Sequence, residues 1–246
     1  MSDDGDTDDD ARPTADLRSY GRRRGRKLSP RQAGLLAGLL PRVAVDLAGK
    51  PPACLAAYFG EGTREVWLEV GFGGGEHLVW QARHNPGVGL IGAEPFEEGV
   101  VKVLTAIDEQ GLTNIRLHPD DARDLLRWLP PASIVRAFVL FPDPWPKRKH
   151  VKRRLVNPAT LALLARALKP GAELRLATDI ADYARTMLMA LSTTPEFRWT
   201  ATGADDWRHR PADWPETRYE QKAVREGRRS SYLRLVRVAS KPAGRD

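Results

Sequence analysis

The 246-residue chain has almost no cysteine and no long apolar run. Its single cysteine, Cys54, excludes an internal disulfide and a cysteine-based zinc site, and this scarcity fits a reducing cytoplasm. No stretch of about eighteen apolar residues is present, so we expect no membrane-spanning helix. The start of the chain lacks the charged-then-apolar pattern of an export signal, and the histidines lack metal-ligand spacing. We therefore expect a cytoplasmic protein with no membrane contact and no metal.

Positive charge is in excess, but it is unevenly distributed along the chain. The formal net charge is +7 and the sequence pI is about 9.7. Residues 1–10 carry six aspartates and no cation, so the rest of the chain carries +13. We expect residues 1–16 to form a disordered acidic tail, because they are polar and lack apolar periodicity. The basic body suits a polyanionic partner such as nucleic acid, the alternative being a solvated surface without a partner.

A basic arm and a helical segment follow the tail, over residues 17–62. Residues 18–27 contain six cations, which could bind RNA phosphates or form a disordered basic linker. Ser29-Pro30 is typical of a helix start, with serine as the cap and proline in the first turn. We expect one short helix or two over residues 30–48.

From residue 63 the sequence alternates between apolar strands and amphipathic helices. The predicted strands are 65–70, 88–93, 115–118, 134–141 and 172–178. The predicted helices are 76–84, 95–110, 122–128, 158–168 and 180–191, the fourth of them stopped by Lys169-Pro-Gly171. Such alternation predicts an α/β fold with a mostly parallel sheet and helices on both faces. We assign residues 63–240 to one catalytic domain.

Gly71-Phe-Gly73-Gly-Gly75 closes the first predicted strand and opens a helix. Glycines there let the backbone turn tightly and approach a ligand, although a plain strand–helix turn has the same pattern. The spacing is not the G-x-G-x-x-G of dinucleotide folds. The second strand ends at Glu94, and an acidic residue at that place commonly accepts hydrogen bonds from ribose hydroxyls.

Asp120 and Asp121 follow the third strand and either hold an adenine amino group or cap the next helix. The glycine loop, Glu94 and these aspartates all stand at carboxyl ends of successive strands. Ligands of open α/β sheets bind at that edge, so the pattern favours a nucleoside cofactor.

A stiff aromatic loop follows the fourth strand: Phe141-Pro-Asp143-Pro-Trp145-Pro-Lys147. Its prolines hold it extended, so that Asp143 and Trp145 can be fixed over a pocket. Residues 147–154 contain six cations and a histidine, which suits phosphates. The alternative is a proline-rich surface loop with a solvated cation run.

These motifs together resemble the bacterial tRNA (guanine-N7)-methyltransferases, over roughly residues 18 to 238. The blocks that carry the resemblance are 69–73, 92–94, 141–154, 217–220 and, more briefly, 177–179. The resemblance implies a Rossmann-like class I methyltransferase fold, S-adenosylmethionine as cofactor and tRNA as substrate. The implied reaction methylates N7 of guanine 46 in the variable loop.

The resemblance also implies residue roles. For the cofactor these are Glu69, Gly71, Gly73, Glu94, Asp121 and Asp143, with Asp143 also the active-site carboxylate. For the substrate they are Lys147, Asp179, Thr217, Arg218, Tyr219 and Glu220. For RNA contact they are Lys149, Lys152, Arg153 and Arg154. Tyr219 stands where phenylalanine is usual, and the neighbouring Asp120 leaves the Asp121 assignment uncertain by one place.

The chemistry of methyl transfer to guanine N7 makes the expected roles of these residues more specific. Guanine N7 carries a free lone pair at neutral pH, so no base must remove a proton, and alignment and electrostatics are the protein's tasks. Asp143 is then expected to position the reactants, and Lys147 to meet O6 or a phosphate. Asp179 and Glu220 could accept from guanine N1 and N2.

Two other functions stay open. One is an amino-group methyltransferase, whose loop would have an Asp/Asn-Pro-Pro-aromatic order for a flipped base. The other is a non-catalytic RNA-binding module. The presence of the cofactor-site residues Glu69, Glu94 and Asp143 argues against this alternative. The sequence leaves monomer and homodimer equally open.

Overall fold

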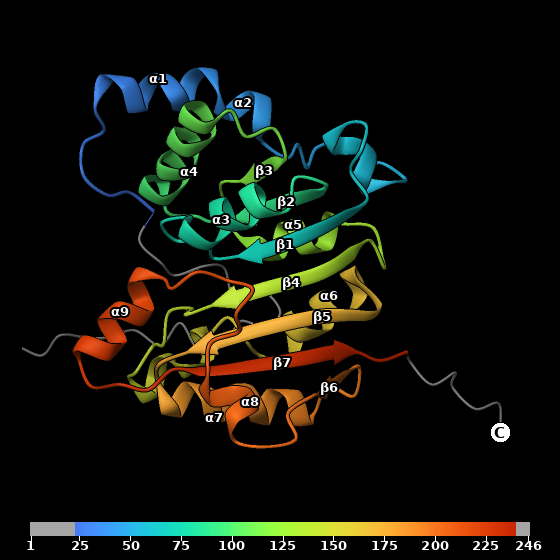
Figure 1. Cartoon of the computed structure of the whole chain (residues 1–246), viewed down its shortest axis with the longest axis vertical. Helices are drawn as coiled ribbons and strands as arrows, with labels where there is room; N and C mark the ends of the chain where they lie inside the picture. Colours follow the sequence, from blue (N-terminus) through green and yellow to red (C-terminus); the bar gives the residue numbers. More distant parts are fainter. Residues whose placement is uncertain (1–22, 240–246) are drawn as a thin grey trace, which may run out of the picture.

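A seven-stranded mixed sheet organises the chain in the computed structural model, which describes residues 23–239 (Figure 1). The strand order is β3-β2-β1-β4-β5-β7-β6. The strands are β1 (Glu65–Val70), β2 (Val88–Ala93), β3 (Ile115–His118), β4 (Ile134–Leu140), β5 (Leu168–Thr178), β6 (Phe197–Trp199) and β7 (Ser231–Arg237). The first five pair in parallel, while β7 is antiparallel to β5 and β6 is antiparallel to β7. The expected mostly parallel sheet is confirmed.

Helices connect the strands and cover the sheet. They are α1 (Pro30–Gly38), α2 (Leu40–Val43), α3 (Glu76–His84), α4 (Glu97–Gln110), α5 (Ala122–Trp128), α6 (Pro158–Ala167), α7 (Ala181–Ser192), α8 (Asp205–Arg208) and α9 (Arg218–Arg225). Two 3-10 turns, η2 (Leu55–Phe59) and η3 (Arg148–Arg153), lie in the connections. In Figure 1 the arrowheads of β1, β4 and β5 point toward the edge at which α9 lies. The carboxyl ends of these strands and α9 therefore share one end of the molecule.

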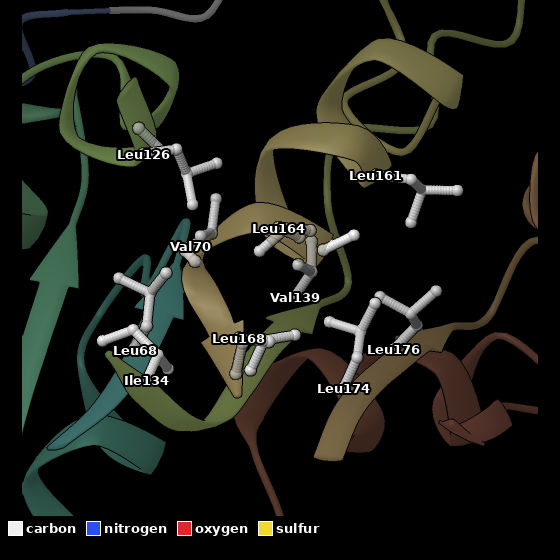
Figure 2. Packing of buried hydrophobic residues seen from close by; sticks show 14 of the residues in the cluster. Leu68, Val70, Leu126, Ile134, Val139, Leu161, Leu164, Leu168, Leu174 and Leu176 are labelled. Carbon is white, nitrogen blue, oxygen red and sulfur yellow. The ribbon is translucent and has the colours of Figure 1, made fainter. Parts of the chain in front are cut away.

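Alternate side chains of the central strands β1, β2 and β4 pack into two different cores, one on each face of the sheet. Leu68 and Val139 belong to the core that also contains residues of α5, α6 and α7, part of which Figure 2 shows. Trp67 and Phe138 belong to the core that contains residues of α3 and α4. Neighbours along a strand point to opposite faces, so these assignments confirm that helices cover both sides.

From residue 63 onward the predicted elements match the observed ones to within two residues, with one correction. The helical segment expected over residues 30–48 ends earlier, at Val43. The strand expected at 172–178 begins at Leu168, directly after α6. Lys169-Pro-Gly171 does end the helix, but it lies inside β5, where Leu168 pairs with Ile134 and the register then shifts. Gly171 has a φ of 84°, which glycine adopts without strain. The segment is thus an irregularity in a strand rather than a loop before it.

The N-terminal segment packs onto the sheet domain. Ser29 caps α1 in a capping box with Gln32, as the Ser-Pro pattern predicts. Leu35 and Leu39 pack against the α3–α4 core, and the N–H of Val45 donates to the carbonyl of Leu117 at 2.8 Å. Two helices are confirmed here. The acidic tail and the first part of the basic arm lie outside the described residues.

Within residues 23–239, no helix combines the length and apolar character needed to cross a bilayer. This agrees with the absence of long apolar runs.

Candidate active site

A cavity of about 290 Å³ opens at the carboxyl ends of β1, β2 and β4. The glycine loop, Glu94 and the Asp143 loop all contribute to its wall, as the sequence predicts. Its lining residues are Val70, Gly71, Gly73, Ala93, Glu94, Pro95, Phe96, Asp121, Ala122, Arg123, Leu140, Phe141, Pro142, Asp143, Trp145, Arg153, Leu155 and Tyr219. A mostly apolar hollow with a few convergent carboxylates at this edge is the usual form of a ligand site in an α/β sheet.

The glycine loop is fitted closely against the first turn of α4. Gly71 and Gly73 have φ values of 73° and 54°, in the left-handed region that glycine tolerates. A Cβ atom at Gly99 would lie 2.1 Å from the carbonyl oxygen of Gly73. Glycine at position 99 is therefore needed for the loop and helix to meet.

Glu94 connects the loop to the end of β2. One oxygen of its carboxylate accepts from the N–H of Gly73 at 2.8 Å, and the other accepts from the N–H of Phe96 at 2.9 Å. Burial raises the pKa of Glu94, although these two donors oppose the rise. The charges of Asp143 and Glu69 raise it further. A carboxylate with two fixed donors keeps lone pairs for a ligand hydroxyl.

The two aspartates after β3 have different surroundings. Asp121 is the N-cap of α5, lines the cavity and accepts from the guanidinium of Arg123 at 2.5 Å and 2.9 Å. Asp120 pairs with Arg23 of the basic arm at 2.7 Å and does not line the cavity. Capping is thus confirmed for Asp121, and its place in the lining leaves contact with an adenine amino group as a prediction.

Glu69 lies behind the cavity wall. It is absent from the lining, and its carboxylate contacts Nδ1 of His77 at 2.7 Å. Both side chains are 3% exposed. Direct contact between Glu69 and a bound ligand would require this pair to rearrange.

The Asp143 loop has an unusual backbone. Phe141 and Trp145 have φ values of 51° and 42°, which are strained for residues with a side chain. The N–H of Phe141 donates to the carbonyl of Ala177 at 2.8 Å and anchors the start of the loop. Asp143 keeps access to solvent, yet the protein atoms around it remove enough water to raise the pKa of its carboxyl.

In the block 217–220, the first and last residues are buried and the middle two are exposed. Thr217 and Glu220 are buried and form the capping box of α9. Glu220 also accepts from the Tyr232 hydroxyl at 2.6 Å and pairs with Arg210 at 3.2 Å. The carboxylate of Glu220, which is 4% exposed, is thus already bonded on both oxygens.

Arg218 and Tyr219, in contrast, are exposed to solvent. The ring of Tyr219 lines the cavity and stacks on Phe141, with 6.4 Å between ring centroids and 14° between planes. The guanidinium of Arg218 lies 5.1 Å from the Tyr219 ring centroid and pairs with Glu76 at 3.4 Å. The aromatic ring of α9 therefore joins the helix to the Asp143 loop.

Asp179 follows β5 and does not line the cavity. Its carboxylate accepts from the guanidinium of Arg228 at 2.7 Å and is 16% exposed. The cations after the loop also differ among themselves. Lys147, Lys149 and Lys152 are exposed, and the guanidinium of Arg153 lies 5.2 Å from the Trp145 ring centroid.

Arg154 is the exception in the cation run, because its side chain is 2% exposed. It contacts Pro144 and α7 rather than solvent. The expectation that this guanidinium meets RNA does not agree with its burial. No group of histidine, cysteine and acidic residues suited to a metal ion occurs among residues 23–239.

A family model described as "Putative methyltransferase" matches residues 63–233. A tRNA (guanine-N(7)-)-methyltransferase of Rhodospirillum rubrum is 50% identical, over 90% of this chain and 88% of its own length. Proteins of the same name from Chelativorans sp. and Agrobacterium fabrum are 48% and 49% identical, each covering 89% of this chain and 94% of their own length.

The chain belongs to the tRNA (guanine-N7)-methyltransferase family.

Solved structures confirm the class I methyltransferase fold of this family member. An antibiotic-related methyltransferase superposes with a TM-score of 0.54 and 18% identity, over 75% of this chain and 93% of its own. The 16S rRNA methyltransferase KamB superposes with a TM-score of 0.55 and 16% identity, over 78% and 96%. At such identities the likeness concerns the fold alone.

Three residues around the site of this methyltransferase were not singled out from its sequence. Gly99 had a usable signal, since glycine in the first turn of a helix is unfavourable unless something packs closely against it. His77 and Arg123 had none, because their partners, Glu69 and Asp121, are identified only by the folded geometry.

Proposed function

We propose that this protein transfers a methyl group from S-adenosylmethionine to N7 of guanine 46 in the variable loop of tRNA. One observation supports this above all: the blocks 69–73, 92–94 and 141–147 of a family member converge on one cavity at the carboxyl edge of the sheet. We place the reaction in the cytoplasm, with tRNA as the macromolecular partner.

The cavity fits a nucleoside cofactor. Glu94 offers lone pairs to ribose hydroxyls at the end of β2. The backbone of Gly73 packs against Gly99 too closely for a Cβ atom, so the glycine loop is held in place at the edge of the cavity. Asp121 and the apolar Phe96 also line the cavity, and the Asp121 carboxylate could accept from the amino edge of a base if a bond to Arg123 opens.

When bound, S-adenosylmethionine supplies a methyl carbon on a sulfonium, which is already electrophilic. The residues of the chain therefore have to align N7 and exclude water rather than generate a nucleophile. Asp143 lies at the rim between the two reactants, and its raised pKa reflects a partly dry position. We assign it a positioning role, because N7 has no proton to remove.

Recognition of guanine is assigned to the outer rim. Tyr219 and Trp145 both line the cavity and provide faces on which a base can stack. Asp179 could accept from N1 and N2 if its bond to Arg228 opens. Glu220 is less suited, because its oxygens are already bonded, and we assign Thr217 and Glu220 to holding α9. Arg218, exposed beside the Tyr219 ring, and Lys147 could contact O6 or phosphates.

Backbone contact with tRNA is assigned to Lys149, Lys152 and Arg153. They follow the Asp143 loop directly, so a strand whose guanine enters the cavity would pass over them. Lysine and arginine in such a place neutralise phosphates without reading sequence.

The test is incubation of the protein with unmodified tRNA and methyl-labelled cofactor, followed by mapping of the labelled nucleotide. We expect N7-methylguanine at position 46. Label on an exocyclic amine would instead identify an amino-group methyltransferase. If no label is transferred and calorimetry detects no cofactor binding, the protein is a non-catalytic RNA-binding module.

A further inference from the structure

The buried guanidinium of Arg154 connects the Asp143 loop with α7. Its Nε donates to the carbonyl of Pro144 at 2.8 Å, and its Nη2 donates to the carboxylate of Asp182 at 2.5 Å. Nη1 donates to the hydroxyl of Thr186, and the guanidinium lies 4.9 Å from the ring centroid of Tyr183. Burying a charge is costly unless its donors are paired, and here every guanidinium nitrogen has a partner.

Pro144 stands between Asp143 and Trp145, so this bond fastens the loop at its middle. Phe141 and Trp145 both lie in the left-handed region, and such strain persists only where surrounding contacts enforce it. Phe141 is held by the carbonyl of Ala177. Arg154, which follows η3, is the second anchor, and it links the loop to α7.

The segment after η3 is bonded to α7 as well. The N–H of Val156 donates to the Tyr183 hydroxyl at 3.1 Å, and burial raises the pKa of Tyr183 to about 12. Asp182 is largely exposed, so the ion pair is buried only on the arginine side. The rigid fork of a guanidinium bonds the loop and the helix through different nitrogens, whereas a lysine has a single nitrogen and cannot reproduce this geometry.

We propose that Arg154 is a positioning residue that holds Asp143 and Trp145 over the cavity through the carbonyl of Pro144, and that it makes no contact with RNA. This proposal rests on the proposed function for its catalytic consequence. Its structural part, the fastening of the loop, can be measured without any reaction.

The first readout is hydrogen exchange in the free protein. In Arg154→Gln and Asp182→Asn we expect the amides of Asp143, Trp145 and Lys147 to exchange faster than in the wild type. Asp182→Asn alters an exposed side chain and keeps the fold testable if Arg154→Gln is unstable. Lys169→Gln, at the start of β5, is the matched control and should leave these amides unchanged.

The second readout is catalysis. Arg154→Gln should lower kcat about tenfold to a hundredfold at saturating tRNA, because misplacement of aligned groups has effects of that size. Its Kd for tRNA and the slope of log Kd against log salt should stay at the wild-type values. Arg154→Lys should recover part of kcat, since one of the two bonds can form.

Two results would overturn the inference. A weaker tRNA affinity with a salt slope reduced by about one would make Arg154 a phosphate contact. A lower melting temperature with unchanged loop exchange and unchanged kcat would make it merely structural. If the wild type transfers no methyl group but the loop exchange responds as expected, the proposed function fails while the fastening stands.

Discussion

The carboxylate of Glu69, at the end of β1, lies 2.7 Å from Nδ1 of His77 in α3. The amide nitrogen of Gln81 contacts Nε2 of the same ring at 3.1 Å and donates to the carbonyl of Asp213 at 2.9 Å. The amide nitrogen of Gln81 can only donate, so Nε2 of His77 is the acceptor. The ring hydrogen is therefore on Nδ1, which faces Glu69. Glu69 is therefore connected, through two buried side chains, to the segment that leads into α9.

We predict that His77→Ala destabilises the protein by about 2–4 kcal/mol, because it leaves a buried carboxylate without its donor. Urea unfolding of the wild type and the variant measures this change. The double variant Glu69→Gln/His77→Ala should lose less than the sum of the two single variants. Additive losses would show that the pair is not coupled.

The contact between the glycine loop and α4 gives a second prediction. Gly99→Ala should weaken cofactor binding about tenfold or more, because a Cβ atom 2.1 Å from the Gly73 carbonyl must displace the loop. Titration calorimetry measures the affinity. Gly38→Ala is the control: an added Cβ has open space there and should leave cofactor affinity unchanged. Equal affinities in wild type and Gly99→Ala would show that the loop accommodates the methyl group.

The raised pKa of Glu94 predicts a dependence of stability on pH. The folded chain holds this proton more tightly than the unfolded chain, so the contribution of Glu94 to stability is fully present below its ordinary pKa of 4.5. It is lost as the pH rises through the raised, folded value. Relative to Glu94→Gln, the wild type should therefore lose stability as the pH increases from 4.5 toward neutrality. A constant difference between the two unfolding free energies over this range would contradict the account.

The exposed cations after the Asp143 loop should act through phosphate contact. Lys149→Gln and Lys152→Gln should each weaken tRNA binding and reduce the salt slope by about one. Lys169→Gln removes a similar exposed charge at the start of β5, away from the cavity, and should change neither quantity. Filter binding across a salt titration measures both, and equal effects at all three positions would mean that only overall charge matters.

Strand and helix positions could be predicted because they depend on local patterns. The alternation of apolar runs and capped helices determines the order of elements, and the glycines and Glu94 mark the carboxyl ends of their strands. Side-chain partners were harder to predict. In the sequence, Arg154 is indistinguishable from the other cations of the basic run. Its burial depends on Asp182 and Thr186, which are distant from it in the sequence.

The partners of Glu220 were equally hard to predict from the sequence. The block Thr217-Arg-Tyr-Glu220 resembles a substrate-binding motif of the family, yet its first and last residues form a capping box. That spacing is itself a helix-start signal and could have been read as one. The bonds from Tyr232 and Arg210 depend on residues outside the block, so they follow only from the fold.

The central claim is that N7 of one guanine accepts the methyl group. The most direct measurement compares methyl transfer to unmodified tRNA with transfer to the same tRNA carrying 7-deazaguanine at position 46. That change removes N7 and keeps O6, N1 and N2. We predict that the wild-type protein methylates the first RNA and leaves the second unlabelled while still binding it. Equal labelling of both would contradict the account.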